Sequence, residues 1–299
     1  MRPDYALIGH SIDHRLRISL GAPTGGPIAC GVDLARIDDD GWPSREVTLA
    51  VQAAGHDLLA ELRSYDKREG VPLALAGEAE DRLVRLCHVA SGFETIYRLG
   101  GFVRGNSLGR CAPDAGLEDL LAAVPATVVD DIRRQMMLAA DPGPFPALRE
   151  LPAGQRICGP VFDGSPHVGG ADADFILGGC LIDCKATIRP ERLGRAALYQ
   201  LAGYLLLDYH DTYRIRRTGL YLSRQGALID WDIDEFLRLL GARLPLPNLR
   251  ATCHQALTGT AVANTARDTT PAEPCPPPPP RALLPRPRHQ LPVQDTLFD

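Results

Sequence analysis

Two aspartates and one lysine, Asp174, Asp183 and Lys185, lie in one short segment of the chain. The lysine is unusual, because the chain has only two lysines against thirty arginines. A lysine ammonium is a compact charge on a flexible stem, whereas an arginine guanidinium is a planar fork. A site that must place one small cation beside an attacking water and a phosphate would use lysine. The alternative is a surface ion pair, which is common and weak.

The sequence around these residues predicts a β-hairpin. Residues 173–176 and 181–184 are expected to form strands, and a Gly-Gly pair between them is a strong turn signal. Because side chains alternate along a strand, Asp183 and Lys185 share one face. Asp174 is expected to come alongside them across the hairpin.

Two carboxylates at this distance repel each other unless a cation lies between them. Magnesium takes oxygen ligands and usually keeps several waters, so two aspartates and a substrate phosphate would form a reasonable shell. The chemistry that we expect is hydrolysis of a phosphodiester, assisted by Mg²⁺ or Mn²⁺.

A helix is predicted to follow the second strand, over residues 191–207, with Pro190 suited to its first turn. Gln200 and Tyr204 are four residues apart, so they share a face of this helix. Such a pair is common in helices. It gains weight because it lies in the first helix after the hairpin.

These residues resemble the active-site motifs of a known group of enzymes. Asp174, then Asp183-Cys-Lys185, then Gln200-Leu-Ala-Gly-Tyr204 are similar to the motifs of the PD-(D/E)xK nuclease superfamily. The Gln-x-x-x-Tyr element points to its RecB-type branch. The resemblance covers residues 169–204.

The resemblance implies a restriction-endonuclease-like core and a role for each residue. Asp174 and Asp183 would bind Mg²⁺ with help from the Cys184 carbonyl. Lys185 would orient or activate the attacking water, and Gln200 and Tyr204 would position the DNA or the site.

Two further features are weaker. Gly9-His-Ser-Ile-Asp13-His14 is similar to the Gly-x-x-x-His opening helix of RecB-type modules, but Asp13 stands at the expected histidine, with His10 and His14 nearby. The branch often supplies another acidic ligand from an upstream helix, for which Glu94, with Glu80 behind it, is the candidate. The alternative for both glutamates is a solvated helix carboxylate.

The first half of the chain is predicted to be mostly helical. Helices are expected over residues 12–20, from a cap at Ser44 through Leu62, over 78–99, and over 116–140 with a break at Pro125; a Gly/Pro-rich loop is expected up to Pro43. From Arg156 the pattern changes to strands. After the helix with Gln200 come a hairpin of residues 219–224 and 227–231 and a last helix that opens at Asp232. The sequence predicts an α/β fold with a mixed central sheet.

The net charge of −5 argues against a histone-like DNA coat. Between residues 185 and 224, however, eight basic residues face only three acids. A basic patch beside a metal site suits binding to the phosphate backbone, and Arg189, Arg192 and Arg195 are the expected DNA contacts. The alternative is a solvated helix face and a charged loop.

The eight cysteines are scattered without a Cys-x-x-Cys pair, so reduced, mostly buried thiols are expected. Only Cys253 and Cys275 follow the last nuclease helix, and no iron–sulfur cluster is expected. Cys180 and Cys184 should face the core, away from Asp183. Neither a signal peptide nor a membrane span is expected, which favours a cytoplasmic protein.

Beyond Gly259 the composition becomes rich in proline, with ten prolines between Pro271 and Pro292. This predicts a disordered, semi-rigid tail at residues 259–299. Its end resembles short Gln-x-x-Leu-Phe peptides that dock into the bacterial sliding clamp, through Gln294, Leu297 and Phe298. The alternative is a plain terminus.

The expected protein is thus one RecB-like nuclease domain at residues 1–258, with a helical part at 1–150 and a catalytic sheet core at 151–245. Its expected function is Mg²⁺-dependent DNA cleavage in repair, recombination or defence. The alternative is a catalytically silent DNA-binding or assembly subunit. Silent members of the superfamily typically lose the lysine or an aspartate, and both are present here.

Overall fold

The computed structural model describes residues 5–22, 25–35, 41–66, 70–102, 105–141 and 143–259. These residues form an α/β fold with one mixed sheet, as the sequence predicts. The clamp-type peptide with Gln294, Leu297 and Phe298, and the proline-rich tail apart from Gly259, lie outside these ranges. Among the described helices, none has the length and apolar character to cross a membrane.

Seven helices precede the first strand in the described part of the chain. They are α1 Tyr5–Ser19, α2 Gly26–Leu34, α3 Arg45–Asp66, α4 Gly77–Leu99, α5 Leu117–Ala122, α6 Ala126–Ala140 and α7 Phe145–Arg149. Ser44 caps α3 as predicted, since its hydroxyl accepts a hydrogen bond of 3.3 Å from the Val47 amide. The predicted break at Pro125 is also confirmed, because it separates α5 from α6.

The loop predicted up to Pro43 is wrong, because α2 lies within it. Pro27 occupies the first turn of this helix, where a missing amide proton has no cost, and Ile28 and Val32 are buried. Gly31 faces α4 at backbone contact: a Cβ at this position would lie 1.9 Å from the Phe93 carbonyl oxygen. Gly31, one of the residues that suggested a loop, therefore allows α2 and α4 to pack closely.

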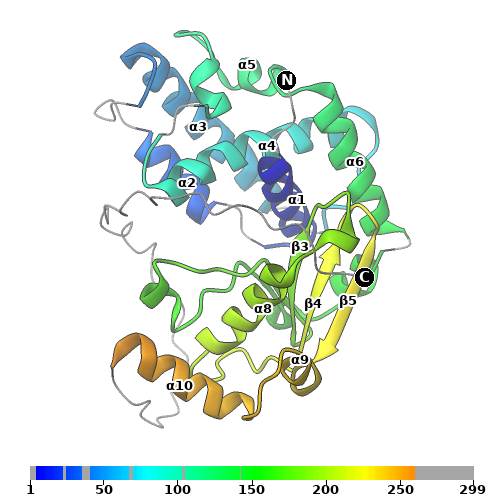
Figure 1. Ribbon diagram of the computed structural model, residues 1–299. Coiled ribbons are helices and arrows are strands. Elements are labelled where there is room, and N and C mark those ends of the chain that lie inside the picture. The colour runs from blue at the N-terminus through cyan, green and yellow to red at the C-terminus, as the bar shows by residue number, and fades with distance from the viewer. Residues whose placement is uncertain are drawn as a thin grey trace.

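The sheet has five strands in the order β1-β2-β3-β4-β5. Their bounds are β1 Arg156–Cys158, β2 Phe175–Leu177, β3 Cys180–Lys185, β4 Arg217–Leu222 and β5 Ala227–Asp232. Strands β3 and β4 are parallel and the other neighbours are antiparallel. The connection between the parallel strands contains α8 Arg195–Leu207, which lies across the sheet in Figure 1.

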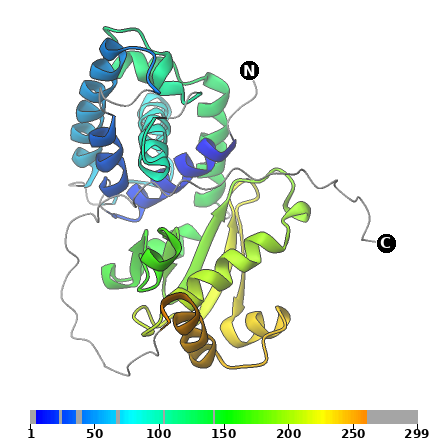
Figure 2. The same cartoon turned by 60° about the vertical axis from the view of Figure 1, so that its left-hand side comes forward.

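The two faces of the sheet bury different layers. Phe175, Ile182 and Tyr221 pack into a core shared with α1 to α6, whereas Leu181 and Leu220 pack against α8 and the C-terminal helices. Cys180 and Cys184 lie on the first face, as predicted, opposite to the face of Leu181. Figure 2 shows the blue to teal N-terminal helices gathered at one end, with the green and yellow strands beneath them.

Three details of the C-terminal half differ from the prediction. Pro190 begins a short 3-10 turn, Pro190–Arg192, and α8 starts only at Arg195. The helix after Asp232, α9 Ile233–Leu239, lacks a side-chain cap from that residue. A further helix, α10 Leu246–Thr258, packs on α8 and was not predicted.

Candidate active site

The hairpin of β2 and β3 brings Asp174 and Asp183 together. The register pairs Phe175 with Ile182, so Asp174, one residue before β2, comes opposite Asp183. Asp174 Oδ2 accepts a hydrogen bond of 2.6 Å from the Cys184 amide. Cys184 thus fixes the rotamer of Asp174 through its backbone.

Lys185 connects the hairpin to α8. Its Nζ lies 2.6 Å from Asp183 Oδ2 and donates a hydrogen bond of 2.9 Å to Gln200 Oε1. Gln200 Nε2 in turn donates to the Tyr204 hydroxyl at 2.8 Å. The structure therefore joins Asp183, Lys185, Gln200 and Tyr204 in one continuous chain of polar contacts, with Asp174 beside its first member.

Burial makes both carboxylates reluctant to ionise together. Burial, then the nearby charge of Asp174, raise the pKa of Asp183 to about 7, although Lys185 opposes the shift. Burial also raises the pKa of Asp174. The hydrogen bond from the Cys184 amide and the charges of Arg17 and Lys185 lower this pKa, but burial outweighs them. Each carboxyl therefore keeps its proton more readily than an exposed aspartate does, and a cation bound between them would favour ionisation of both.

The donor set suits a hard cation. Asp183 Oδ2 is buried, and the Lys185 ammonium 2.6 Å away is its ion-pair partner. Carboxylate oxygens are the ligands that Mg²⁺ prefers, usually with several waters. Within the described residues, no group of three or more His, Cys, Asp or Glu side chains is arranged to hold a metal ion. Asp174 and Asp183 remain the candidate carboxylate ligands, and the expected ligand roles of the Cys184 carbonyl and of Glu94 stay predictions.

Helix α1 adds a second ion pair beside Asp174. Arg17 Nη2 lies 2.7 Å from Asp13 Oδ2; Asp13 is buried, and Arg17 is partly buried. Burial raises the pKa of Asp13 well above its usual range. The charge of Arg17 opposes this shift, and the charge of Asp174 adds to it. Burial lowers the pKa of Arg17, but the carboxylates of Asp13 and Asp174 outweigh this effect and raise the pKa above its usual value. Asp13, noted in the sequence only as a departure, is therefore electrostatically part of the site.

Glu94 contacts basic side chains from two helices, α1 and α4. His14 Nε2 lies 2.8 Å from Glu94 Oε2, and Arg98 Nη2 lies 2.6 Å from Glu94 Oε1. Burial raises the pKa of Glu94, but the contacts with His14 and Arg98 outweigh this effect and hold the pKa well below its usual range. Glu94 is 2% exposed, so the alternative of a solvated carboxylate is wrong.

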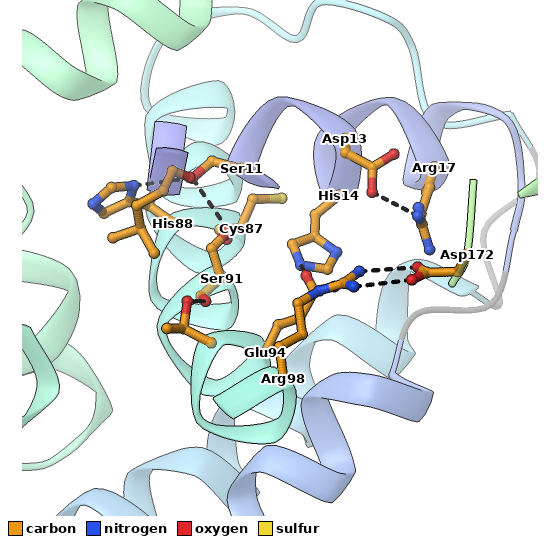
Figure 3. A network of polar contacts seen from close by, with 12 residues as sticks. Ser11, Asp13, His14, Arg17, Cys87, His88, Ser91, Glu94, Arg98 and Asp172 are labelled. Atoms are coloured by element: carbon orange, nitrogen blue, oxygen red, sulfur yellow. Dashed lines mark hydrogen bonds and ion pairs between the residues drawn. The ribbon is translucent and has the colours of Figure 1, made fainter. Parts of the chain in front are cut away.

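Arg98 continues this network to the sheet. Its guanidinium binds Asp172 through two hydrogen bonds of 2.9 Å, so it bridges Glu94 and the segment that leads into Asp174. Figure 3 shows Arg98 between Glu94 and Asp172, with Asp13 and Arg17 next to them. Sequence reasoning missed Arg17, Arg98 and Asp172. The i, i+4 spacing of Asp13 with Arg17 and of Glu94 with Arg98 is the signal that could have found two of them.

Glu80 has a structural role away from this site. It pairs with Arg15, whose Nε and Nη2 donate hydrogen bonds of 3.0 and 2.7 Å, and it accepts a third from the Leu75 amide. Arg15 is fully buried and Glu80 is 2% exposed. Glu80 is thus neither solvated nor a neighbour of Asp174.

The three expected DNA contacts are exposed. Arg189, Arg192 and Arg195 lie on the segment that leads into α8 and on its first turn, and none of them forms an ion pair with the described residues. By contrast, Arg217 pairs with Asp230 and Arg224 with Asp131. Three exposed arginines without an ion-pair partner among the described residues therefore lie near the start of α8.

Comparison of the chain with protein-family models, with curated proteins and with solved structures gives no match.

Proposed function

We propose that the protein is a Mg²⁺-dependent DNA nuclease with a restriction-endonuclease-like core. The observation that carries the proposal is the continuous contact from Asp183 through Lys185 and Gln200 to Tyr204, with Asp174 opposite. Buried ion pairs are costly to form. A partly exposed lysine beside two carboxyls whose pKa values are raised by burial is hard to explain by stability alone.

Each side chain has a distinct task in this proposal. Asp174 and Asp183 would hold the cation, which when bound would stabilise the negative charge that develops on the phosphate. Lys185 would orient the attacking water, because its ammonium carries three donors and only some of them are engaged by Asp183 and Gln200. Gln200 and Tyr204 would fix the position of Lys185.

The surroundings of the site support a polyanionic substrate. Arg189, Arg192 and Arg195 are exposed without ion-pair partners in the described part of the chain. Phosphate contacts of this kind give affinity that does not depend on base sequence. Helix α8 carries both Arg195 and Gln200, so it would link backbone binding to the reacting atoms.

The test combines cleavage with a binding measurement. Purified protein would be incubated with linear, circular, single-stranded and double-stranded DNA in Mg²⁺ or EDTA. In parallel, the melting temperature would be measured with increasing Mg²⁺. At a tenfold excess over the dissociation constant, a bound ion adds about 1.4 kcal/mol, or roughly 2–4 °C for a chain of this size.

The variants Asp174→Asn and Asp183→Asn should lose both the cleavage and the Mg²⁺-dependent shift. Asp230→Asn is the matched control, because Asp230 pairs with an arginine outside the site. Binding of DNA without cleavage and without a Mg²⁺ shift would instead favour the silent DNA-binding subunit. Cleavage that survives in both variants would contradict the site.

A further inference from the structure

Tyr199 on α8 is a large aromatic side chain that the fold leaves uncovered. It is 56% exposed, although most aromatic residues of the described part of the chain are buried. Its ring makes no ring contact and no hydrogen bond with the described residues. The ring is therefore open to contact with a ligand, and an aromatic face of this kind can stack on another flat ring.

The residues around Tyr199 leave room for a flat ligand. On a helix its nearest neighbours are three and four residues away, and two of these are Ala196 and Gly203. A Cβ at Gly203 would meet nothing within 4 Å. Glycine weakens the interior of a helix relative to alanine. The open space beside the ring therefore exists at a cost to helix stability.

The position of Tyr199 ties this surface to the candidate active site. It directly precedes Gln200, which accepts the hydrogen bond from Lys185. Arg195 lies one turn earlier on the same face and is exposed. A ring for a base and a guanidinium for a phosphate thus share one face of the helix that also carries Gln200.

We propose that Tyr199 stacks on an unpaired base and that the substrate class is single-stranded DNA, an inference that rests on the proposed nuclease function. In a duplex the base faces are covered by neighbouring bases, so an exposed ring can reach one only where the strand is single. Stacking between a base and an aromatic ring is worth about 1–3 kcal/mol on alanine substitution, which corresponds to roughly 5-fold to 150-fold in affinity.

Binding can be measured without cleavage, so that the two proposals fail separately. The full chain carrying Asp183→Asn, in EDTA, would be titrated by fluorescence anisotropy into oligothymidine, into the same oligomer with abasic sites, and into a duplex. Adding Tyr199→Ala should weaken binding to oligothymidine by about 10-fold, whereas Tyr199→Phe should bind as well as the parent. Gly203→Leu should also weaken binding, because its side chain would fill the space beside the ring.

The abasic oligomer decides the mechanism. There Tyr199→Ala should cause no further loss, since no base is present to stack on the ring. Tyr5→Ala is the matched control, because Tyr5 is 55% exposed at the far end of α1, and it should change no affinity. An equal loss on the duplex or on the abasic oligomer, or no loss on oligothymidine, would overturn the proposal. Absence of cleavage by the wild type would leave these affinities unaffected.

Discussion

Gln200 of α8 accepts a hydrogen bond of 2.9 Å from Lys185 of β3, so a helix and a strand hold one ammonium group between them. The same ammonium lies 2.6 Å from Asp183 on its own strand. Two partners from different elements restrict the flexible lysine side chain to one region. This restriction is what a side chain that orients a small molecule requires.

Replacement of Lys185 should abolish cleavage without unfolding the protein. Lys185→Ala removes the ammonium and should lower the cleavage rate by about 10²-fold to 10³-fold. Lys185→Arg should fail as well, because a planar guanidinium cannot take the place of a compact ammonium. Initial rates with Mg²⁺ would be compared with those of Lys67→Ala, which removes the only other lysine. Full activity of either Lys185 variant would exclude the assigned role.

The raised pKa of Asp183 predicts a pH-dependent stability in metal-free protein. The pKa rises from 3.8 to about 7 on folding, so between these values the folded protein keeps a proton that the unfolded chain has lost. The stability from this group is therefore full below about pH 4 and falls as the pH rises through 7. Asp183→Asn cannot ionise, so its free energy of unfolding should rise relative to that of the wild type by roughly 4 kcal/mol between pH 4 and pH 7, at about 1.4 kcal/mol for each pKa unit of the shift.

Urea unfolding in EDTA at several pH values measures this difference. Asp230→Asn is the control, because Asp230 is part of a partly exposed ion pair with Arg217. Its difference from the wild type should stay constant within about 0.5 kcal/mol. A difference between Asp183→Asn and the wild type that does not change with pH would show that the carboxyl is not held protonated.

Glu80 should matter for folding rather than for metal binding. Glu80→Ala leaves the fully buried guanidinium of Arg15 without its carboxylate, which should cost about 3–5 kcal/mol. Glu118→Ala is the contrast, because it removes one carboxylate of an exposed pair with Arg82, and the unfolding midpoint should not move. Denaturant unfolding would measure both. A stable Glu80→Ala protein with weakened Mg²⁺ binding would reverse this assignment.

The three exposed arginines should contribute to DNA affinity through the phosphates. Replacing Arg189, Arg192 and Arg195 with alanine should reduce the slope of log affinity against log salt by about 2–3. Replacement of Arg217, which pairs with Asp230, should change the slope less. Anisotropy titrations over a range of salt concentrations give both slopes, and an unchanged slope in the triple variant would show that this surface does not contact DNA.

The hairpin and α8 could be predicted because their signals are local. Strand alternation places Asp183 and Lys185 on one face, a Gly-Gly pair marks the turn, and helical spacing brings Gln200 and Tyr204 together. All of these depend on residues near one another in the sequence. The structure therefore agrees with the predicted arrangement of these four side chains.

The contacts that α1 and α4 make with the sheet could not be predicted in the same way. Arg98 and Asp172 meet only after the helical half has packed on the sheet, and nothing in either local pattern specifies the other. Helix α2 was missed because its glycine and proline residues are also those of loops. The positions of Glu94 and Asp13 relative to Asp174 likewise depend on tertiary packing.

The peptide at the end of the chain gives a prediction that does not depend on the fold. A peptide of residues 292–299 should bind the sliding clamp of the source organism at micromolar strength, because Leu297 and Phe298 would fill an apolar groove. Leu297→Ala with Phe298→Ala should eliminate this binding and leave cleavage of short naked DNA intact. Calorimetry without a heat signal for the unmodified peptide would remove the clamp as a partner.

The close contact of Gly31 with α4 has a consequence for genetics. Phe93, whose carbonyl faces Gly31, directly precedes Glu94, so any side chain at residue 31 must push this part of α4 away. The displacement would pass along Glu94 and Arg98 to Asp172 and so to the hairpin. A random screen scored only for loss of DNA cleavage should therefore return alleles at codon 31, although that residue touches none of the proposed reacting groups.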